Sequence, residues 1–143
     1  MTTELWQLEA TETARLVRER TVSAVEVTEA HIARIDAVNG KLNAIVVRTD
    51  EHARAQAALI DNGSATGPLA GVAMTTKINT DHVPYAMDNG IAMLKDNMSS
   101  MTHKCIEGLL TDGAVMLGRT NSPSFALRSH TGNDLHGETH NPH

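Results

Sequence analysis

The sequence is poor in aromatic residues and cysteine, and it has no long apolar run. Trp6, Tyr85 and Phe125 are its only aromatic residues, so the core must be aliphatic, with seven Met among its candidates. Its one cysteine, Cys105, excludes an internal disulfide and fits a reducing compartment. No apolar run approaches the roughly 18 residues that a membrane helix needs, and the acidic N-terminus lacks a signal-peptide pattern. We therefore expect a cytoplasmic protein that does not enter a membrane.

An excess of basic residues is also lacking. The chain has 12 Lys and Arg against 17 Asp and Glu, a net charge of −5. General nucleic-acid binding needs a basic face, so this balance argues against it. A length of 143 residues suits one domain with a real core.

Two helices are predicted in the N-terminal third. Residues 4–20 alternate acidic, apolar and basic side chains without Gly or Pro, as an exposed amphipathic helix would. Ser23 and Glu26 have the spacing of a capping box, and they open a second helix whose apolar residues lie on one face. Asn39-Gly40 is expected to end this helix in a left-handed conformation.

Apolar strands alternate with further helices in the rest of the chain. Residues 42–47, 71–78 and 114–117 are predicted strands, whereas 51–60 and 103–112 are predicted helices. Asp50 is a candidate cap for the first of these helices, and Ser99 to Thr102 offer several caps for the second. The segment after Gly118 is polar and loop-rich. This order predicts an α/β fold in which helices pack on a mixed, partly parallel sheet.

The C-terminal sequence HGETHNPH raises the possibility of a metal site. His136 and His140 would share one face of a helix, which is a spacing that zinc sites use. Gly137 and Pro142 argue against a helix here, so solvated loop histidines are the favoured interpretation. The other candidate ligands nearby are Glu138, His130 and His143.

Two single residues have a functional and a structural interpretation. His31 lies on the apolar face of the second predicted helix, where a histidine is usually an interior residue with one hydrogen-bond partner. Cys105 has Lys104 beside it, and that charge would favour a thiolate. No His–Asn pair is placed to activate this cysteine, so we favour the structural interpretation for both residues.

Lys77 is the only charged residue of the stretch GPLAGVAMTTKIN, residues 67–79. A lysine in an apolar strand either extends to the surface or is desolvated. An amine that has lost its proton can act as a general base toward a serine hydroxyl. Taken alone, the pattern favours a solvated lysine on an edge strand over a catalytic one.

Two blocks of the sequence favour the catalytic interpretation of Lys77. GPLAGVAMTTKINTDH (residues 67–82) and DGAVMLGRTNSPSFALRSHTGNDLHGETHNP (residues 112–142) resemble the N-terminal part of the amidase signature family. The resemblance covers essentially the whole chain. It implies hydrolysis of carbon–nitrogen bonds in small amides by a Ser–cis-Ser–Lys triad, with no metal and no cofactor.

The resemblance assigns roles to particular residues. Lys77 matches the catalytic lysine, which would deprotonate the bridging serine. Asn121 and Pro123 match a segment that shapes the wall of the site. The loop toward the serine-rich core is matched by Gly137, Thr139, Asn141 and Pro142.

The same resemblance leaves the triad incomplete. The Gly/Ser-rich signature that carries both serines would follow Asn141-Pro142, so we expect residues 1–143 to be a fragment that is inactive alone. In this interpretation residues 1–62 form N-terminal helices and a first strand, and 67–143 begin the catalytic core of one partial domain. An exposed sheet edge would favour a homo-oligomer. The alternatives are a non-catalytic binding or scaffold protein with an amidase-like half-fold, and a metal-binding module.

Overall fold

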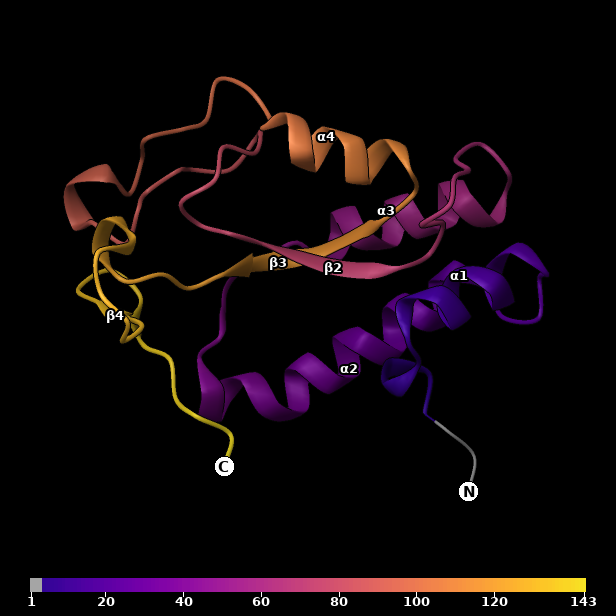
Figure 1. Cartoon of the computed structure of the whole chain (residues 1–143), viewed down its shortest axis with the longest axis horizontal. Coiled ribbons are helices and arrows are strands. Elements are labelled where there is room, and N and C mark those ends of the chain that lie inside the picture. The colour runs from indigo at the N-terminus through magenta and orange to yellow at the C-terminus, as the bar shows by residue number, and fades with distance from the viewer. Residues whose placement is uncertain (1–3) are drawn as a thin grey trace. The chain divides into compact units, whose positions relative to one another are not determined.

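The computed structural model describes residues 4–143, and Figure 1 shows the course of the chain. Its secondary structure confirms the predicted α/β class. The helices are α1 (Ala10–Arg18), α2 (Ala24–Leu42), α3 (Asp50–Asp61) and α4 (Lys104–Thr111), with 3-10 turns η1 (Leu5–Gln7), η2 (Ala92–Leu94) and η3 (Ser124–Ala126). The strands are β1 (Ile45–Arg48), β2 (Ala73–Lys77), β3 (Val115–Thr120), β4 (Gly132–Asn133) and β5 (Gly137–Glu138).

Strand β3 is the middle strand of a three-stranded sheet with the order β1-β3-β2. Strand β1 runs antiparallel to β3, and Arg48 lies opposite Gly118. Val115 N donates to Val72 O at one end of β2, and Ile78 N donates to Thr120 O at the other. Residue numbers rise together along this pair, so β2 and β3 run parallel. The sheet is therefore mixed, as the sequence predicts, and β2 is an edge strand.

The chain divides into two compact units that interleave along the sequence. Unit 1 comprises Met1–Ala37, Thr49–Met74 and Gly108–Leu117, and unit 2 comprises Val38–Arg48, Thr75–Glu107 and Gly118–His143. The strands β2 and β3 each pass from unit 1 into unit 2.

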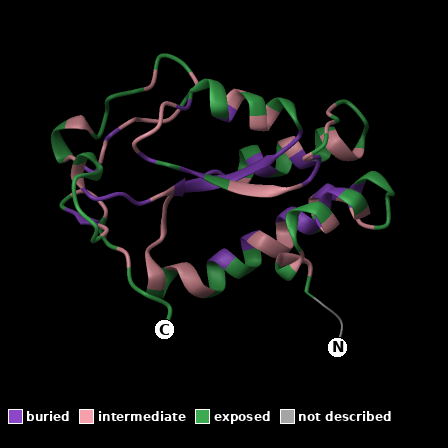
Figure 2. Ribbon diagram, in the orientation of Figure 1, coloured by how far each residue is buried: buried purple, intermediate pink, exposed green. Residues whose placement is uncertain are grey.

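Unit 1 has the aliphatic core that the shortage of aromatic residues predicts. Small and branched side chains from α1, α2, α3 and β3 fill it, and β3 is buried along nearly its whole length (Figure 2). Burying such side chains stabilises a fold by about 25 cal/mol per Å² of apolar surface. The fully or almost fully buried members include Ala24, Val27, Ala53, Ala57, Ala114 and Val115.

The start of unit 1 differs from the prediction of one helix over residues 4–20. The turn η1 ends at Gln7, and α1 begins only at Ala10. Leu8 and Glu9 between them have extended backbones, with ψ angles of 145° and 153°. The amphipathic pattern predicts the helical residues, but it does not reveal this break.

The predicted capping box opens α2. Ser23 N donates to Glu26 Oε2 at 2.8 Å, and Glu26 N donates to Ser23 Oγ at 3.0 Å. Asp61 adds a second cap from the end of α3, because its two carboxylate oxygens accept from Ala24 N and Val25 N. This distant cap has no signal in the sequence.

The predicted end of α2 at Asn39-Gly40 is wrong. The helix continues to Leu42, and Asn43 takes the left-handed conformation with φ of 50°. The side chain of Asn39 instead forms hydrogen bonds with the segment that follows the helix. Its Oδ1 accepts from Ala44 N and Ile45 N, and its Nδ2 donates to Ile45 O. Because its side chain makes these hydrogen bonds, Asn39 stays helical and the helix continues past it.

The Gly67-Pro68 turn at the start of the lysine-bearing stretch packs tightly against the end of α4. A Cβ atom at Gly67, where φ is 148°, would lie 2.3 Å from Asp112 O. Only glycine fits so close to a backbone. Leu69 N then donates to Asp112 O and Gly71 N to Gly113 O, which leads the chain into β2 beside β3.

In unit 2, Ser99 and Thr102 do not cap α4. Ser99 Oγ accepts from His82 N, and Thr102 Oγ1 accepts from Val83 N. The backbone carbonyl of His103 accepts from Ile106 N and Glu107 N at the start of the helix. The predicted hydroxyl caps are therefore wrong, since these side chains hold the preceding loop in place.

Within the described chain no helix is long and apolar enough to cross a bilayer.

Candidate active site

The lysine of the sequence prediction lies at the end of β2. The adjacent parallel strand β3 ends beside it, because Ile78 N donates to Thr120 O and Thr120 Oγ1 donates to Thr76 O. The chain that follows β3 therefore comes next to Lys77. This arrangement brings together two residues that are 44 positions apart in the sequence, Lys77 and Asn121.

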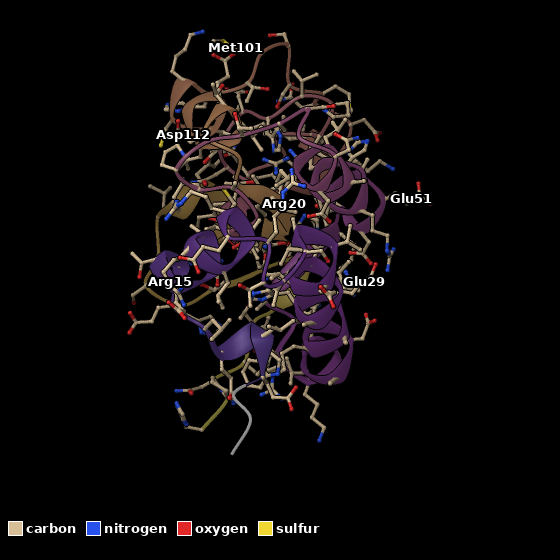
Figure 3. All side chains as sticks on the ribbon, turned by 90° about the vertical axis from the view of Figure 1, so that its right-hand side faces the viewer. Arg15, Arg20, Glu29, Glu51, Met101 and Asp112 are labelled. Atoms are coloured by element: carbon tan, nitrogen blue, oxygen red, sulfur yellow. The ribbon has the colours of Figure 1, made fainter. Side chains whose placement is uncertain are left out.

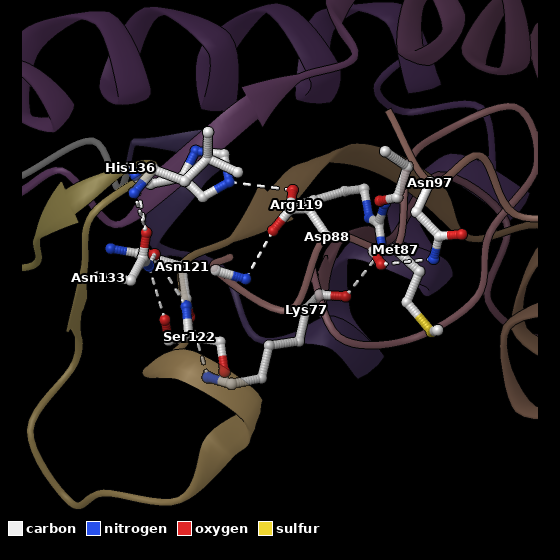
Figure 4. A network of polar contacts seen from close by, with 12 residues as sticks. Lys77, Met87, Asp88, Asn97, Arg119, Asn121, Ser122, Asn133 and His136 are labelled. Carbon is white, nitrogen blue, oxygen red and sulfur yellow. Dashed lines mark hydrogen bonds and ion pairs between the residues drawn. The ribbon is translucent and has the colours of Figure 1, made fainter. Parts of the chain in front are cut away.

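The Lys77 side chain extends to the surface, and its ammonium group is fixed at one point. Lys77 is exposed, and its Nζ donates a hydrogen bond of 3.0 Å to the main-chain carbonyl oxygen of Asn121 (Figure 4). Among residues 4–143, no serine hydroxyl is hydrogen-bonded to this Nζ atom. The end of the lysine is thus oriented by backbone.

Asn121 is held rigidly by its own side chain, which is 3% exposed. Its Oδ1 accepts from Ser122 N at 2.9 Å and from Asn133 Nδ2 at 2.7 Å. Its Nδ2 donates to Gly137 O at 3.0 Å and to Thr139 Oγ1 at 3.1 Å. All four contacts fix the carbonyl group that receives Lys77, because they leave the residue no freedom to rotate.

The β4–β5 hairpin closes around this asparagine. Asn133 pairs with Gly137 across the hairpin, and its Oδ1 accepts from Leu135 N and His136 N in the turn. Thr139 Oγ1 continues the chain of contacts by donating to Asn43 O at 2.7 Å. Figure 4 shows Asn121 and Asn133 side by side in this network.

A buried carboxylate and a histidine form the next part of the network. His136 Nε2 lies 3.0 Å from Asp88 Oδ2, with 16% of the histidine side chain and 5% of the aspartate side chain exposed. Asp88 Oδ1 accepts from Gly90 N at 2.7 Å. The pair links the hairpin to the loop before α4.

A fully buried arginine supports the backbone of the lysine. Arg119 is 0% exposed, and its guanidinium donates to Lys77 O at 3.1 Å, to Thr80 O at 2.5 Å and to Ala86 O. Burial lowers the pKa of Arg119, and the negative charges of Asp88 and Asp81 oppose this effect. Arginine stays charged in proteins, so its charge is balanced by these carbonyl dipoles and nearby carboxylates.

The structure thus unites some of the predicted residues and not others. Lys77, Asn121 and Thr139 belong to one network, and Pro123 is buried directly after it. Asn141 is exposed, and its side chain accepts only from His143 N. Its predicted place in the site is a hypothesis that these contacts do not support.

The remaining candidates from the sequence are the histidines of HGETHNPH, His31 and Cys105. The histidines of HGETHNPH do not gather, and among the described residues no three His, Cys, Asp or Glu side chains form a metal-ligand group. His31 is half-buried, and burial lowers its pKa. Cys105 is exposed on α4.

Arg119, Asn133 and the Asp88–His136 pair are absent from the sequence-based prediction. Arg119 had a signal, because it is a charged residue directly after the apolar strand residues 114–117. The other three are polar residues in segments rich in turns, where such residues are ordinary. Only the fold brings them together.

Comparisons with known proteins show the family to which the chain belongs. The family model for amidases matches residues 26–143, so the chain belongs to the amidase family, and its sequence corresponds to the N-terminal portion. An indoleacetamide hydrolase of Bradyrhizobium diazoefficiens is 39% identical over 142 residues, covering 96% of this chain and 27% of that protein. An acylamidase of Rhodococcus erythropolis is 37% identical over 141 residues, covering 94% of this chain and 29% of that protein.

Solved structures share the fold of this chain. A bacterial aryl acylamidase of the amidase signature family superposes with a TM-score of 0.89 at 30% identity, covering 98% of this chain and 30% of that one. The complex of 6-aminohexanoate cyclic dimer hydrolase with its substrate gives a TM-score of 0.86 at 31% identity, covering 98% of this chain and 28% of the hydrolase. The chain therefore spans less than a third of the length of these relatives.

Proposed function

We propose that Lys77 is the general base of an amide hydrolase with a Ser–cis-Ser–Lys triad, whose two serines lie outside residues 1–143. The observation that carries the proposal is the hydrogen bond from Lys77 Nζ to Asn121 O, made at the ends of two parallel strands in a chain of the amidase family. In this proposal residues 67–143 begin the catalytic core, and residues 1–62 support it.

The geometry of Lys77 suits proton transfer. A protonated amine has three N–H donors and no acceptor, whereas a neutral amine keeps two donors and one lone pair. Neutral Lys77 can therefore donate to Asn121 O and at the same time accept a proton from a serine hydroxyl. The fixed carbonyl restricts the direction in which that lone pair points, which is what a positioned general base requires.

In the proposed reaction, the nucleophilic serine attacks the carbonyl carbon of the amide. Its proton passes through the bridging serine to Lys77 Nζ. The C–N bond then breaks, and the proton returns by the same route to the departing amine. Water hydrolyses the remaining ester, which releases the carboxylic acid and restores the serine. Asn121, Pro123 and Thr139 shape the wall beside the lysine, and the substrates are small carboxamides.

The proposal is tested with the polypeptide encoded by the whole reading frame that contains residues 1–143. We expect it to release ammonia from phenylacetamide, and we expect Lys77→Ala to lower kcat by about 10²-fold or more, as loss of a general base does. Residues 1–143 alone are expected to give no turnover.

Lys41→Ala is the matched control, because Lys41 is an exposed lysine at the end of α2. It is expected to keep the native rate. Activity of Lys77→Ala close to the native value, with an unchanged circular dichroism spectrum, would reject the general-base role.

A further inference from the structure

Unit 1 contains a cavity of about 440 Å³. All of its lining residues belong to unit 1, and none belongs to the network around Lys77. They come from the end of α1, the turn and first residues of α2, the end of α3 and the loop before β2. Sites for small molecules usually have volumes of about 300–1,000 Å³, so this cavity has the size of a ligand site.

The wall of the cavity is partly apolar and partly polar. Hydroxyl groups of Thr21, Ser23 and Thr66 stand among the apolar residues. A few polar groups on an apolar wall are the usual composition of a small-molecule site, since the apolar wall supplies affinity and the polar groups fix orientation. The apolar members are Val17, Val22, Ile60, Ala65 and Ala70.

The two carboxylates of the wall are already engaged. Glu26 accepts from the backbone and hydroxyl of Ser23 at 2.8 Å each, and these hydrogen bonds lower the pKa of Glu26. Asp61 accepts from two backbone amides at the start of α2, at 2.7 Å and 3.0 Å. The positive end of the helix dipole also compensates both charges.

The two arginines of the wall are not engaged. Among residues 4–143, neither the Arg18 nor the Arg20 guanidinium takes part in a hydrogen bond or an ion pair. Arg15 on the same helix differs, because it pairs with Glu12 and Glu19. The cavity therefore has two unpaired cations and two satisfied anions, which makes it complementary to an added anion.

The backbone at Arg20 is a second, independent observation. Its φ is 57°, at the position that follows Glu19, the C-cap residue of α1, where glycine is favoured. Residues other than glycine rarely adopt this conformation, because the Cβ atom then lies close to the following carbonyl oxygen. Residues held in this way cluster at active sites and ligand clamps, and here the Arg20 side chain lines the cavity. Arg20 is among the labelled side chains in Figure 3.

We propose that the cavity binds a small monocarboxylate with an apolar body, and that Arg20, assisted by Arg18, pairs with its carboxylate. The apolar body lies against the valines, Ile60 and the alanines of the wall. The proposal does not depend on the amide chemistry of Lys77.

The test is NMR titration of the 15N-labelled chain with phenylacetate. We expect saturable shifts of the backbone amides of Thr21, Ser23 and Gly67, which line the cavity. Neutral phenylacetamide is expected to bind at least about tenfold more weakly, because it lacks the negative charge that strengthens hydrogen bonds to a guanidinium. Arg20→Gln is expected to weaken the binding of phenylacetate by a similar factor.

Two further variants separate binding from folding. Arg20→Gly is expected to keep or raise Tm, since glycine accepts the left-handed backbone, while it loses binding. Arg15→Gln removes one positive charge from α1, outside the cavity wall, and is expected to keep binding. Equal binding of phenylacetate and phenylacetamide, tighter binding of phenethylamine, or shifts confined to residues outside the cavity would each overturn the proposal.

Discussion

The Nζ atom of Lys77 lies 3.0 Å from the main-chain carbonyl oxygen of Asn121. The two residues meet because β2 and β3 run parallel and end together. The hydrogen bonds that buried polar groups make with the Asn121 side chain hold its main-chain carbonyl group in place. The position of the lysine therefore depends on residues that do not touch it.

Replacing Asn121 by Asp is expected to destabilise the chain at neutral pH. Asp has no N–H to donate, so a carboxylate oxygen would face Gly137 O and Thr139 Oγ1 in a buried position. Leaving such groups unsatisfied costs about 1–3 kcal/mol, and more for a charged group. Urea unfolding at pH 7 measures the loss, which should diminish at pH 4 as the carboxylate is protonated. Asn141→Asp, at an exposed position, is the control and should change little.

Replacing Arg119 by Met is expected to cost about 3 kcal/mol or more of unfolding free energy. The methionine fills much of the volume but leaves the carbonyl oxygens of Lys77, Thr80 and Ala86 without their donor. Chemical denaturation provides the measurement. Arg128→Met removes an exposed guanidinium and should stay within about 0.5 kcal/mol. Equal losses in both variants would contradict the structural role of Arg119.

Replacing Asp61 by Asn is expected to reduce stability by about 1–2 kcal/mol. The amide nitrogen of Asn would face one of the two backbone N–H donors, Ala24 N or Val25 N, and the negative charge at the start of α2 would be lost. Thermal unfolding followed at 222 nm measures the effect. Asp96→Asn, on an exposed side chain, serves as the comparison. No difference between the two variants would mean that α2 does not need this distant cap.

Acid should destabilise the chain partly through His31. Burial lowers the pKa of His31 in the folded chain below its ordinary value of about 6.5. Below that value the unfolded chain therefore binds more protons than the folded chain, and stability falls as pH decreases. His31→Leu is expected to reduce the difference in Tm between pH 7.5 and pH 5.5. His143→Asn, at an exposed position, should leave that difference unchanged. An identical Tm difference in native chain and His31→Leu would reject the effect.

Local signals in the sequence predict much of the fold. The capping box of Ser23 and Glu26 was predicted correctly, because both partners lie within one helical turn. The helix predicted over residues 51–60 is also correct, since α3 spans Asp50–Asp61. The end of α2 was not, because Asn39 finds its partners in the strand that follows rather than in its own backbone.

The amino-acid sequence alone predicts the class of the fold, the aliphatic core and the place of Lys77 in a strand. These features depend on composition, on periodicity and on a resemblance carried by contiguous residues. The surroundings of the lysine depend on the tertiary structure. They come from three separate segments, which carry Asp88, then Arg119 and Asn121, and then Asn133 and His136. Each would be an ordinary polar residue alone. They act together because burial forces every polar group to find a partner, and those partners are set by how the chain folds back on itself.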